Sequence, residues 1–374
     1  MKILILGGAG FIGSHLVDEL IKRDHEITVY DNLEPQVHGI LNKPPDYLAK
    51  NIKFIRDDIL NTDSLIQSLK DIEIVYHLAA MVGVGQSMYQ IEKYVEINTL
   101  GTAKLLDILI NKENDVKKLI VASSMSTYGE GGYICDHCNQ VNPDLRGIDQ
   151  LNEGFWEIKC PNCGKILNPI PTNEEKPQNC TSIYALTKKE QEKMCMLIGE
   201  TYGLDTTALR FFNVYGSRQS LSNPYTGVCA IFSSSLLNQN SPRIYEDGYQ
   251  SRDFVHVKDV CQALILSMDK NQAKNEVFNV GTGRQITINQ VAEVLTKNIN
   301  SKIKPNITSK YRAGDIRHCF ADISKISSKL GYKPKYTFEE GMKELIEWVK
   351  VQQGRVIDNS NLADEILIKS GLIK

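Results

Sequence analysis

The sequence predicts an α/β protein built on a doubly wound parallel sheet, with a smaller α+β part and one small insertion. Three observations support this fold class: short apolar runs alternate with helical patterns through the first half, a glycine-rich turn follows the first apolar run, and two Cys-x-x-Cys pairs interrupt the alternation. Near-continuous apolar strands separated by helices are typical of a parallel sheet that is covered on both faces.

The expected strands of this sheet are rich in Ile, Val and Leu. They lie at 2–7, 26–31, 52–59, 72–79, 118–124 and 205–216, and the clearest helical patterns between them lie at 15–23, 62–70 and 98–111. Connections between parallel strands in such a sheet are right-handed crossovers. The segment 275–283, "NEVFNVGTG", is expected to return to the same sheet as a further strand.

The turn after the first strand has the pattern of a dinucleotide-binding loop. Gly7, Gly10 and Gly13 satisfy both G-x-G-x-x-G and G-x-x-G-x-x-G, and a helix is expected to begin directly after them. Such glycines let backbone N–H groups approach a pyrophosphate and let the helix pack on the strand. Asp31, followed by Asn32, ends the second strand, where a carboxylate binds the adenosine ribose and repels a 2′-phosphate. The loop therefore predicts a Rossmann sheet that binds NAD rather than NADP, with Asp58 as a further contact to the adenine.

Composition limits the other classes of function. The chain has 374 residues, of which 42% are hydrophobic and 24% charged, with a formal net charge of −2. This charge gives no sign of a nucleic-acid partner, and no apolar run approaches the roughly 18–20 residues of a membrane span. Nine cysteines, four of them in two Cys-x-x-Cys pairs, suit a reducing compartment and a metal better than a disulfide framework. We expect a cytoplasmic enzyme with no membrane and no nucleic-acid partner.

Three side chains have the pattern of an acid–base centre. Tyr184 and Lys188 form a Tyr-x-x-x-Lys pair at the start of a helical pattern, and their i, i+4 spacing puts both on one helix face. A nearby ammonium lowers the pKa of a phenol, so that the tyrosine acts as a base. Ser124 ends the fifth strand and is expected to place a hydroxyl beside a substrate oxygen next to the tyrosine.

Several longer motifs carry a family resemblance from residue 1 to about 348. They are "GGAGFIGSHL", "HLAA", "NTLGT", "ASSMSTYG", "YALTK", "LRFFNVYG", "SRDFVHVKDV" and "FNVGTG". With these motifs the chain resembles the extended short-chain dehydrogenase/reductases, specifically their nucleoside-diphosphate-sugar epimerases and dehydratases. The resemblance implies catalytic roles for Ser124, Tyr184 and Lys188, a sugar-nucleotide substrate, NAD as cofactor and a homodimer.

The resemblance also assigns the binding residues. The residues expected to surround NAD are Gly7, Gly10, Phe11, Ile12, Gly13, Asp31, Asn32, Asp58, Ile59, Leu78, Ala79, Ala80, Asn98, Tyr184, Lys188 and Phe211. The residues expected to bind the sugar nucleotide are Ser124, Ser126, Asn213, Arg252, Arg312 and Asp315. Arginines suit this role because they form bidentate, charge-assisted hydrogen bonds with phosphate.

The residues after Ser124 decide between reactions of the family. A 4,6-dehydratase typically has an Asp-Glu pair there, whereas this chain has Met125 and Ser126, which cannot exchange a proton usefully near neutral pH. The expected reaction is therefore 4-epimerisation through a transient 4-keto sugar. Sugar-nucleotide decarboxylation, dehydration and a non-enzymatic NAD-sensing role are the weaker alternatives.

The two cysteine pairs predict a metal site in an insertion. Cys135 and Cys138 form one pair and Cys160 and Cys163 the other, which is the ligand spacing of a Cys₄ zinc ribbon; His137 is an alternative ligand. A site closed by four cysteines would be structural. This zinc-ribbon-like insertion, followed by "NVYGSRQSLSNPYTGVCAIFSSSLL", resembles the dTDP-L-rhamnose 4-epimerase group, which converts dTDP-L-rhamnose to dTDP-6-deoxy-L-talose. UDP-glucose or UDP-N-acetylglucosamine 4-epimerisation stays open.

The expected domains interleave along the chain. Residues 1–215 and 251–283 would form the NAD-binding Rossmann domain, which the zinc-knuckle insertion interrupts at 130–171. Residues 216–250 and 284–348 would form the substrate-binding domain. The tail at 352–374 has no family match, although "ADEILIKSGLI" within it could form a short amphipathic helix.

Overall fold

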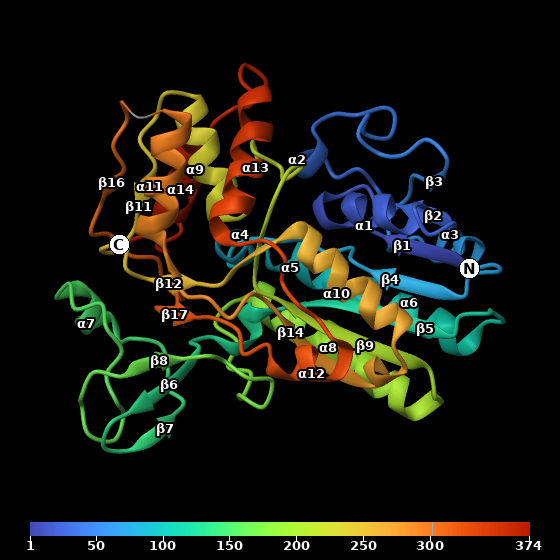
Figure 1. Ribbon diagram of the computed structural model, residues 1–374, viewed down its shortest axis with the longest axis horizontal. Helices are drawn as coiled ribbons and strands as arrows, with labels where there is room; N and C mark the ends of the chain where they lie inside the picture. The colour runs from blue at the N-terminus through green and yellow to red at the C-terminus, as the bar shows by residue number, and fades with distance from the viewer. Residues whose placement is uncertain (301) are drawn as a thin grey trace.

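The central element of the fold is a seven-stranded sheet in which every strand pair is parallel (Figure 1). The structure is a computed structural model that describes residues 1–300 and 302–374. In spatial order the strands are β14 (Glu276–Val280), β9 (Asp205–Phe211), β5 (Lys118–Ser124), β4 (Ile74–His77), β1 (Lys2–Leu6), β2 (Glu26–Tyr30) and β3 (Lys53–Ile55). The chain winds outward from β1 in both directions, which confirms the doubly wound architecture and the return of β14 to the main sheet.

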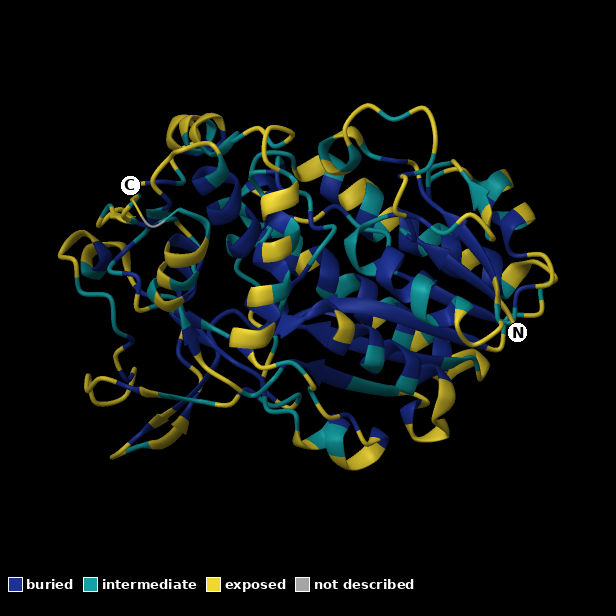
Figure 2. Cartoon of the chain, turned by 45° about the horizontal axis from the view of Figure 1, so that its top comes forward, coloured by how far each residue is buried: buried dark blue, intermediate teal, exposed yellow. Residues whose placement is uncertain are grey.

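Helices cover both faces of this sheet. One face carries α1 (Phe11–Ile21), α10 (Val257–Asp269) and α12 (Ser324–Leu330), and the other carries α3 (Thr62–Ser68), α6 (Gly101–Asn111) and α8 (Ile183–Tyr202). Successive strand residues point to opposite faces, so Ile3 and Ile5 pack in the first layer while Leu4 packs in the second. Figure 2 shows the sheet buried between exposed helix surfaces.

One expected strand is broken in the structure. The sequence predicted a continuous strand at 205–216, but β9 ends at Phe211 and β10 (Asn213–Tyr215) pairs with β13 (Phe254–His256) instead. The break occurs because Phe212 N donates to Val280 O of the main sheet, whereas Asn213 N donates to Asp253 O. The chain therefore leaves the sheet at Phe212 and enters the smaller part.

The smaller part has its own apolar core. It is formed mainly by α9 (Val228–Leu237), α11 (Ile288–Ile299) and α13 (Phe338–Val351). Thr287 is the N-cap of α11 and forms a capping box with Gln290. The short strands of this part are β11 (Arg243–Ile244) with β16 (Asn306–Ile307), and β12 (Ser251–Arg252) between β15 (Ile286–Thr287) and β17 (His318–Cys319).

Two further segments are attached to this body. The insertion holds the antiparallel strands β6 (Gly132–Cys135), β7 (Asn139–Val141) and β8 (Asn168–Ile170) and the helix α7 (Ile148–Asn152), and it projects from the body in Figure 1. The tail forms α14 (Ser360–Lys369). The remaining short helices are α2 (Pro35–His38), α4 (Val84–Ser87), α5 (Ile91–Tyr94), η1 (Val95–Leu100), η2 (Met125–Tyr128) and η3 (Asn271–Ala273).

Candidate active site

A cavity of about 820 Å³ lies where the carboxyl ends of the parallel strands face the smaller part. Open α/β sheets bind ligands at this edge, where the strand order reverses. All of the residues that the sequence assigned to NAD, substrate and catalysis line this cavity, with the exception of Asn98. Its wall therefore brings the glycine turn, the Ser124 and Tyr184 pair and the three residues Arg252, Arg312 and Asp315 into one continuous space.

The backbone of the glycine turn packs closely against the residues that follow β4. Gly7 has φ +77°, and a Cβ atom at this position would lie 2.8 Å from Ala79 N. A side chain there would be strained and would also collide with the backbone. Gly10 precedes the first helical residue of α1, so free N–H groups at the start of α1 face the cavity, where the pyrophosphate of a dinucleotide is bound in this fold.

The carboxylate of Asp31 is held at the end of β2. Its Oδ2 accepts a hydrogen bond from Ala9 N at 3.0 Å and its Oδ1 accepts one from Leu33 N at 2.9 Å. Asn32 Nδ2 donates to Asp58 Oδ2 at 2.8 Å. These contacts fix the ends of β2 and β3 as one polar wall, which fits the ribose and adenine of NAD.

Asn98 lies behind the cavity instead of lining it. It is fully buried, its Oδ1 accepts from Met81 N at 2.7 Å, and its Nδ2 donates to Met81 O and to Thr187 Oγ1. The expectation of direct contact between Asn98 and NAD finds no support in this placement. The side chain instead ties the loop after β4 to the helix that carries Tyr184.

Tyr184 occupies the first turn of α8. Ser182 caps this helix by accepting a hydrogen bond from Ala185 N at 3.1 Å, and Tyr184 N donates to Ser87 Oγ at 3.0 Å. Burial raises the pKa of Tyr184, while a hydrogen bond with Ser124 opposes the rise. Ser124 Oγ also accepts from Ser126 Oγ at 2.9 Å, so three hydroxyl groups lie together at the end of β5.

Lys188 is buried and is hydrogen-bonded to a residue of its own helix. Its Nζ donates to Gln191 Oε1 at 2.7 Å, and Gln191 Nε2 in turn contacts Thr102 Oγ1 and His77 Nε2. Burial lowers the pKa of Lys188 to about 8. The sequence predicted that this ammonium lowers the pKa of Tyr184; in the structure the ammonium donates to Gln191, and the pKa of the phenol is raised by burial.

The part of the cavity wall that comes from the smaller part carries arginine side chains. Arg252 Nη2 donates to Ile316 O at 2.7 Å and its Nη1 donates to Arg317 O at 3.0 Å. Arg312 Nε donates to Asp315 Oδ2 at 2.9 Å, and its guanidinium lies 4.8 Å from the ring centre of Tyr245. Asn213 Oδ1 is buried and has no hydrogen-bond partner among the described residues. These groups offer positive charge and free polar atoms to a phosphorylated ligand.

Sequence reasoning missed one wall of the cavity. Five residues of the tail line it, namely Ser360, Ala363, Asp364, Leu367 and Leu372. The amphipathic pattern of the tail was visible in the sequence, but it could not show which surface the helix covers. The loop at 81–85 and the residues Arg243 and Tyr245 were also not singled out, because no spacing signal marks them.

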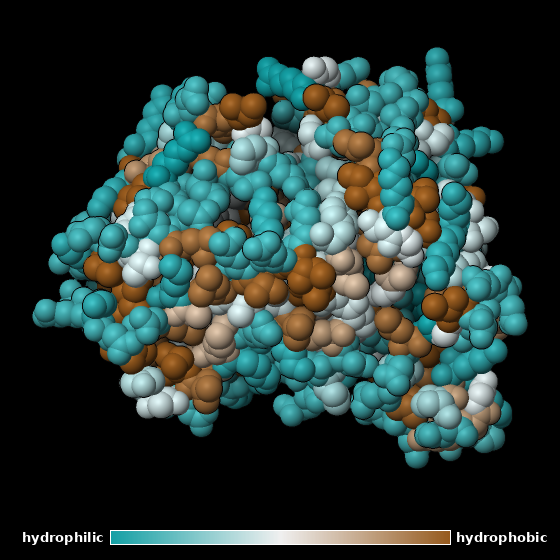
Figure 3. Space-filling view, turned by 180° about the vertical axis from the view of Figure 1, so that it is seen from behind, coloured by the Kyte–Doolittle hydropathy of each residue, from teal (hydrophilic) through white to brown (hydrophobic). Residues whose placement is uncertain are grey.

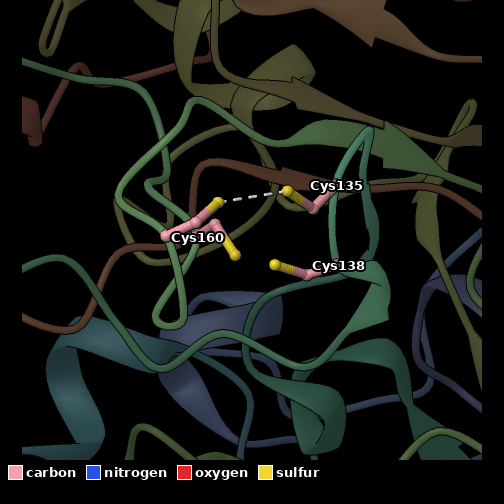
Figure 4. Close-up of side chains that lie close together, drawn as sticks. Cys135, Cys138 and Cys160 are labelled. Carbon is pink, nitrogen blue, oxygen red and sulfur yellow. Dashed lines mark hydrogen bonds between the residues drawn. The ribbon is translucent and has the colours of Figure 1, made fainter.

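The four paired cysteines meet at one point of the insertion (Figure 4). Their Sγ atoms all lie within 4.8 Å of one another, and Cys135 Sγ and Cys163 Sγ are 3.5 Å apart. Sulfurs placed tetrahedrally at about 2.3 Å from zinc are about 3.8 Å apart, so the donor set fits this ion. His137 is hydrogen-bonded to Lys165, so it does not replace a cysteine in the cluster.

Buried ion pairs join the insertion to the smaller part. Arg146 donates to both carboxylate oxygens of Glu246, at 2.8 and 2.9 Å, and also to Asp315 O. Arg317, whose side chain is fully buried, donates to Glu157 at 2.5 Å and to Asp247 at 2.7 Å. Glu130 accepts from Arg317 N at 2.8 Å. The insertion therefore contacts the chain directly after the cavity residues Arg312 and Asp315.

Comparison with known proteins gives the family. The model of the NAD dependent epimerase/dehydratase family matches residues 3–145, and that of the GDP-mannose 4,6 dehydratases matches residues 164–345. A dTDP-L-rhamnose 4-epimerase of Burkholderia thailandensis is 32% identical over 95% of this chain and 96% of its own. The chain belongs to the NAD-dependent epimerase/dehydratase family. The enzyme class expected from the sequence motifs is thereby confirmed at the level of the family.

Other relatives are named for other sugar nucleotides. A putative UDP-glucose 4-epimerase of Methanocaldococcus jannaschii is 33% identical, covering 93% of this chain and 98% of its own. The solved UDP-N-acetylglucosamine 4-epimerase of Methanobrevibacter ruminantium, in complex with UDP-N-acetylmuramic acid, is 35% identical with a TM-score of 0.75, covering 94% of this chain and 98% of its own. A UDP-glucuronic acid 4-epimerase mutant of Bacillus cereus, solved with NAD, is 27% identical with a TM-score of 0.74, covering 94% and 99%. None of the described helices has the length and apolar character to cross a membrane.

Proposed function

We propose that this protein is an NAD-dependent sugar-nucleotide 4-epimerase whose substrate is dTDP-L-rhamnose and whose product is dTDP-6-deoxy-L-talose. The observation that carries the reaction type is that Ser124 and Ser126, at the end of β5, and Tyr184, at the start of α8, line the cavity together next to Met125. The chain offers no carboxylate at positions 125 and 126, so a dehydratase step lacks its acid and base. The choice of substrate rests on the relative from Burkholderia thailandensis and on the cysteine cluster.

The proposed roles follow from the placement of the side chains. Tyr184 takes the proton of the sugar 4-hydroxyl, and Ser124 donates a hydrogen bond to the same oxygen. The cavity residues from the glycine turn to Phe211 would hold NAD, which would supply an acceptor for the C4 hydride and a donor for its return to the opposite face of the sugar. Gln191 and His77 keep Lys188 at the side of α8 that faces the cavity, where it would contact the nicotinamide ribose.

The cysteine cluster would hold a structural zinc ion.

The protein would act as a cytoplasmic homodimer. Both η1 and α8 expose apolar side chains and pack against each other, and exposed residues on them include Val95, Leu100, Leu186 and Leu197. Apolar side chains also gather across the middle of the face in Figure 3. Light scattering of the purified protein measures the assembly, and a monomer at micromolar concentration would contradict the dimer.

The substrate is tested by NMR of the purified protein with dTDP-L-rhamnose, UDP-glucose and UDP-N-acetylglucosamine in separate samples. We expect a single C4 epimer from the dTDP sugar without added cofactor. Turnover of only the UDP sugars would move the assignment to a UDP-hexose 4-epimerase, which the relatives from the two methanogens support. NAD binding without turnover of any sugar nucleotide would favour a regulatory protein.

The mechanism predicts a large effect of Tyr184→Phe. Loss of the phenol removes the base, so kcat should fall about 10²–10⁴-fold, while NAD content measured in the purified protein stays unchanged. Tyr202→Phe, at the exposed end of the same helix, is the matched control and should keep full activity. A Tyr184→Phe variant with more than a tenth of the original kcat would contradict the assigned role.

A further inference from the structure

The tail of the chain follows a defined path across the smaller part. Ile357 N donates to Ser222 Oγ at 3.1 Å, and Asn359 Nδ2 donates to Ser222 O at 2.9 Å. After α14 the chain returns as an extended segment: Tyr311 N donates to Lys374 O at 3.0 Å, and Ala313 N donates to Leu372 O at 2.8 Å. The tail is therefore anchored at both of its ends.

Between these anchors α14 spans the substrate half of the cavity. Ala363 and Leu367 are buried, and both line the cavity. A Cβ atom at Gly85, in the short helix α4 of the NAD-binding part, would lie 3.3 Å from Leu367 Cδ2. The tail thus reaches from the loop after β4 to the segment of Arg312 and Asp315, and it encloses the space between them.

The one acidic side chain of α14 that lines the cavity is paired there with a base. Asp364 Oδ2 lies 2.8 Å from Nη2 of Arg243, and both side chains are largely buried. Two neighbouring cavity residues, Tyr245 and Gln250, have buried oxygen atoms without a hydrogen-bond partner among the described residues. Arg312 lies over the ring of the same Tyr245. A polar corner of this kind is complementary to a ligand that carries both donors and acceptors.

We propose that the segment 356–374 is part of the sugar-nucleotide site and that Asp364, together with Arg243, binds the nucleobase. This inference rests on the proposed function for the existence of a nucleotide substrate. The carboxylate of Asp364 accepts the N3–H of a thymine or uracil ring, while the guanidinium of Arg243 donates to the adjacent carbonyl. Cytosine has no hydrogen on N3, so the same pair disfavours it.

The experiment measures binding of free nucleoside diphosphates to the NAD-loaded protein by calorimetry, with dTDP, UDP, GDP and CDP as probes. We expect dTDP or UDP to bind at least tenfold tighter than CDP. Asp364→Asn should weaken dTDP binding about tenfold and reduce the preference over CDP to within threefold, with NAD content unchanged. Glu365→Gln, at the exposed neighbouring position, is the matched control and should bind as the parent protein does.

A second variant that ends at Gly354 tests the tail as a whole. The truncated protein should retain NAD, and its affinity for dTDP should be more than tenfold weaker. In turnover measurements, Asp364→Asn should raise KM while kcat stays within twofold of the parent value. Equal affinities of the parent and Asp364→Asn for all four probes would overturn the inference, as would tighter binding of CDP or GDP than of dTDP and UDP. Because calorimetry needs no turnover, an inactive protein that binds dTDP through Asp364 would overturn the epimerase proposal and retain this one.

Discussion

The insertion and the tail reach the same stretch of chain, residues 311–318, by different physical means. The insertion contacts its second half through buried charges on Arg146 and Arg317. The tail contacts its first half through backbone hydrogen bonds and apolar side chains. The insertion forms no part of the cavity wall, whereas the tail supplies five residues of it. One addition therefore supports this stretch from outside the cavity, and the other forms part of the cavity wall.

The two additions also differ in how they hold their own shape. The insertion has a small core of six buried residues, which are Tyr133, Cys135, Val141, Ile158, Cys160 and Leu167. Two of these are proposed metal ligands, so we expect the fold of the insertion to depend on the ion. The tail has no core of its own, because its buried residues pack on the cavity rim and on the smaller part. Metal loss should consequently affect the insertion and leave the tail in place.

The largest expected effect is the loss of stability caused by Arg317→Leu, which removes the charged attachment of the insertion. The change removes the fully buried guanidinium that pairs with Glu157, Glu246 and Asp247, which should lower the free energy of unfolding by about 3–5 kcal/mol. Urea unfolding followed by circular dichroism measures this loss. Arg284→Leu, which removes an exposed pair with Glu339, is the control and should cost less than about 1 kcal/mol. Equal losses of unfolding free energy in the two variants would show that the ion pairs of Arg317 stabilise the protein no more than an exposed pair does.

An intermediate effect is expected from Cys163→Ser. The exposed thiol of Cys163 closes the cluster, so its loss should reduce zinc from about one ion per chain to about a tenth or less. Limited proteolysis should then cut within 136–168 while NAD content is retained. Cys180→Ser, a half-buried cysteine outside the cluster, should keep both the zinc and the resistance to protease. Undiminished zinc in Cys163→Ser would contradict the Cys₄ assignment.

The smallest expected effect is a loss of stability at low pH through protonation of Glu157. The hydrogen bonds from His318 and Arg317 lower the pKa of Glu157 to about 2, from an ordinary value of 4.5. A lowered folded-state pKa contributes stability that is present above about pH 4.5 and is lost as the pH falls toward 2. Because Glu157 is partly exposed, we expect this contribution to be about 1 kcal/mol. Unfolding free energies of Glu157→Gln and the parent protein should therefore converge at low pH, and a constant difference would contradict the linkage.

The parts predicted well from the sequence are those set by local patterns. The sheet follows from apolar strands that alternate with helices, the turn at Gly7 from its need for a positive φ, and the cysteine cluster from two fixed spacings. The break at Phe212 could not be predicted, because it depends on which backbone partner each residue finds. The sequence interpretation also did not include the hydrogen bond from Lys188 to Gln191, although both residues lie on the same helix.

Long-range contacts explain most of what the sequence could not show. The partners of Arg317 come from positions 130, 157, 246 and 247, and no spacing rule connects them. Asn98 was assigned to NAD by its family motif, yet the structure uses it to join Met81 to Thr187. The sequence of the tail showed only an amphipathic pattern. The surface that the tail covers is formed by residues far away in the sequence, so it could not be predicted.

The attachment of the insertion has a consequence for the order of events during synthesis. Glu130 and Arg317 are 187 positions apart, whereas Cys135 and Cys163 are 28 apart. The cysteines therefore leave the ribosome together and can close around a metal ion long before Arg317 has been made. Contacts between distant positions form late because a long loop must close first. The insertion is thus expected to be a separately folded lobe on the nascent chain, and its attachment is complete only after Arg317, in the last sixth of the protein, has been translated.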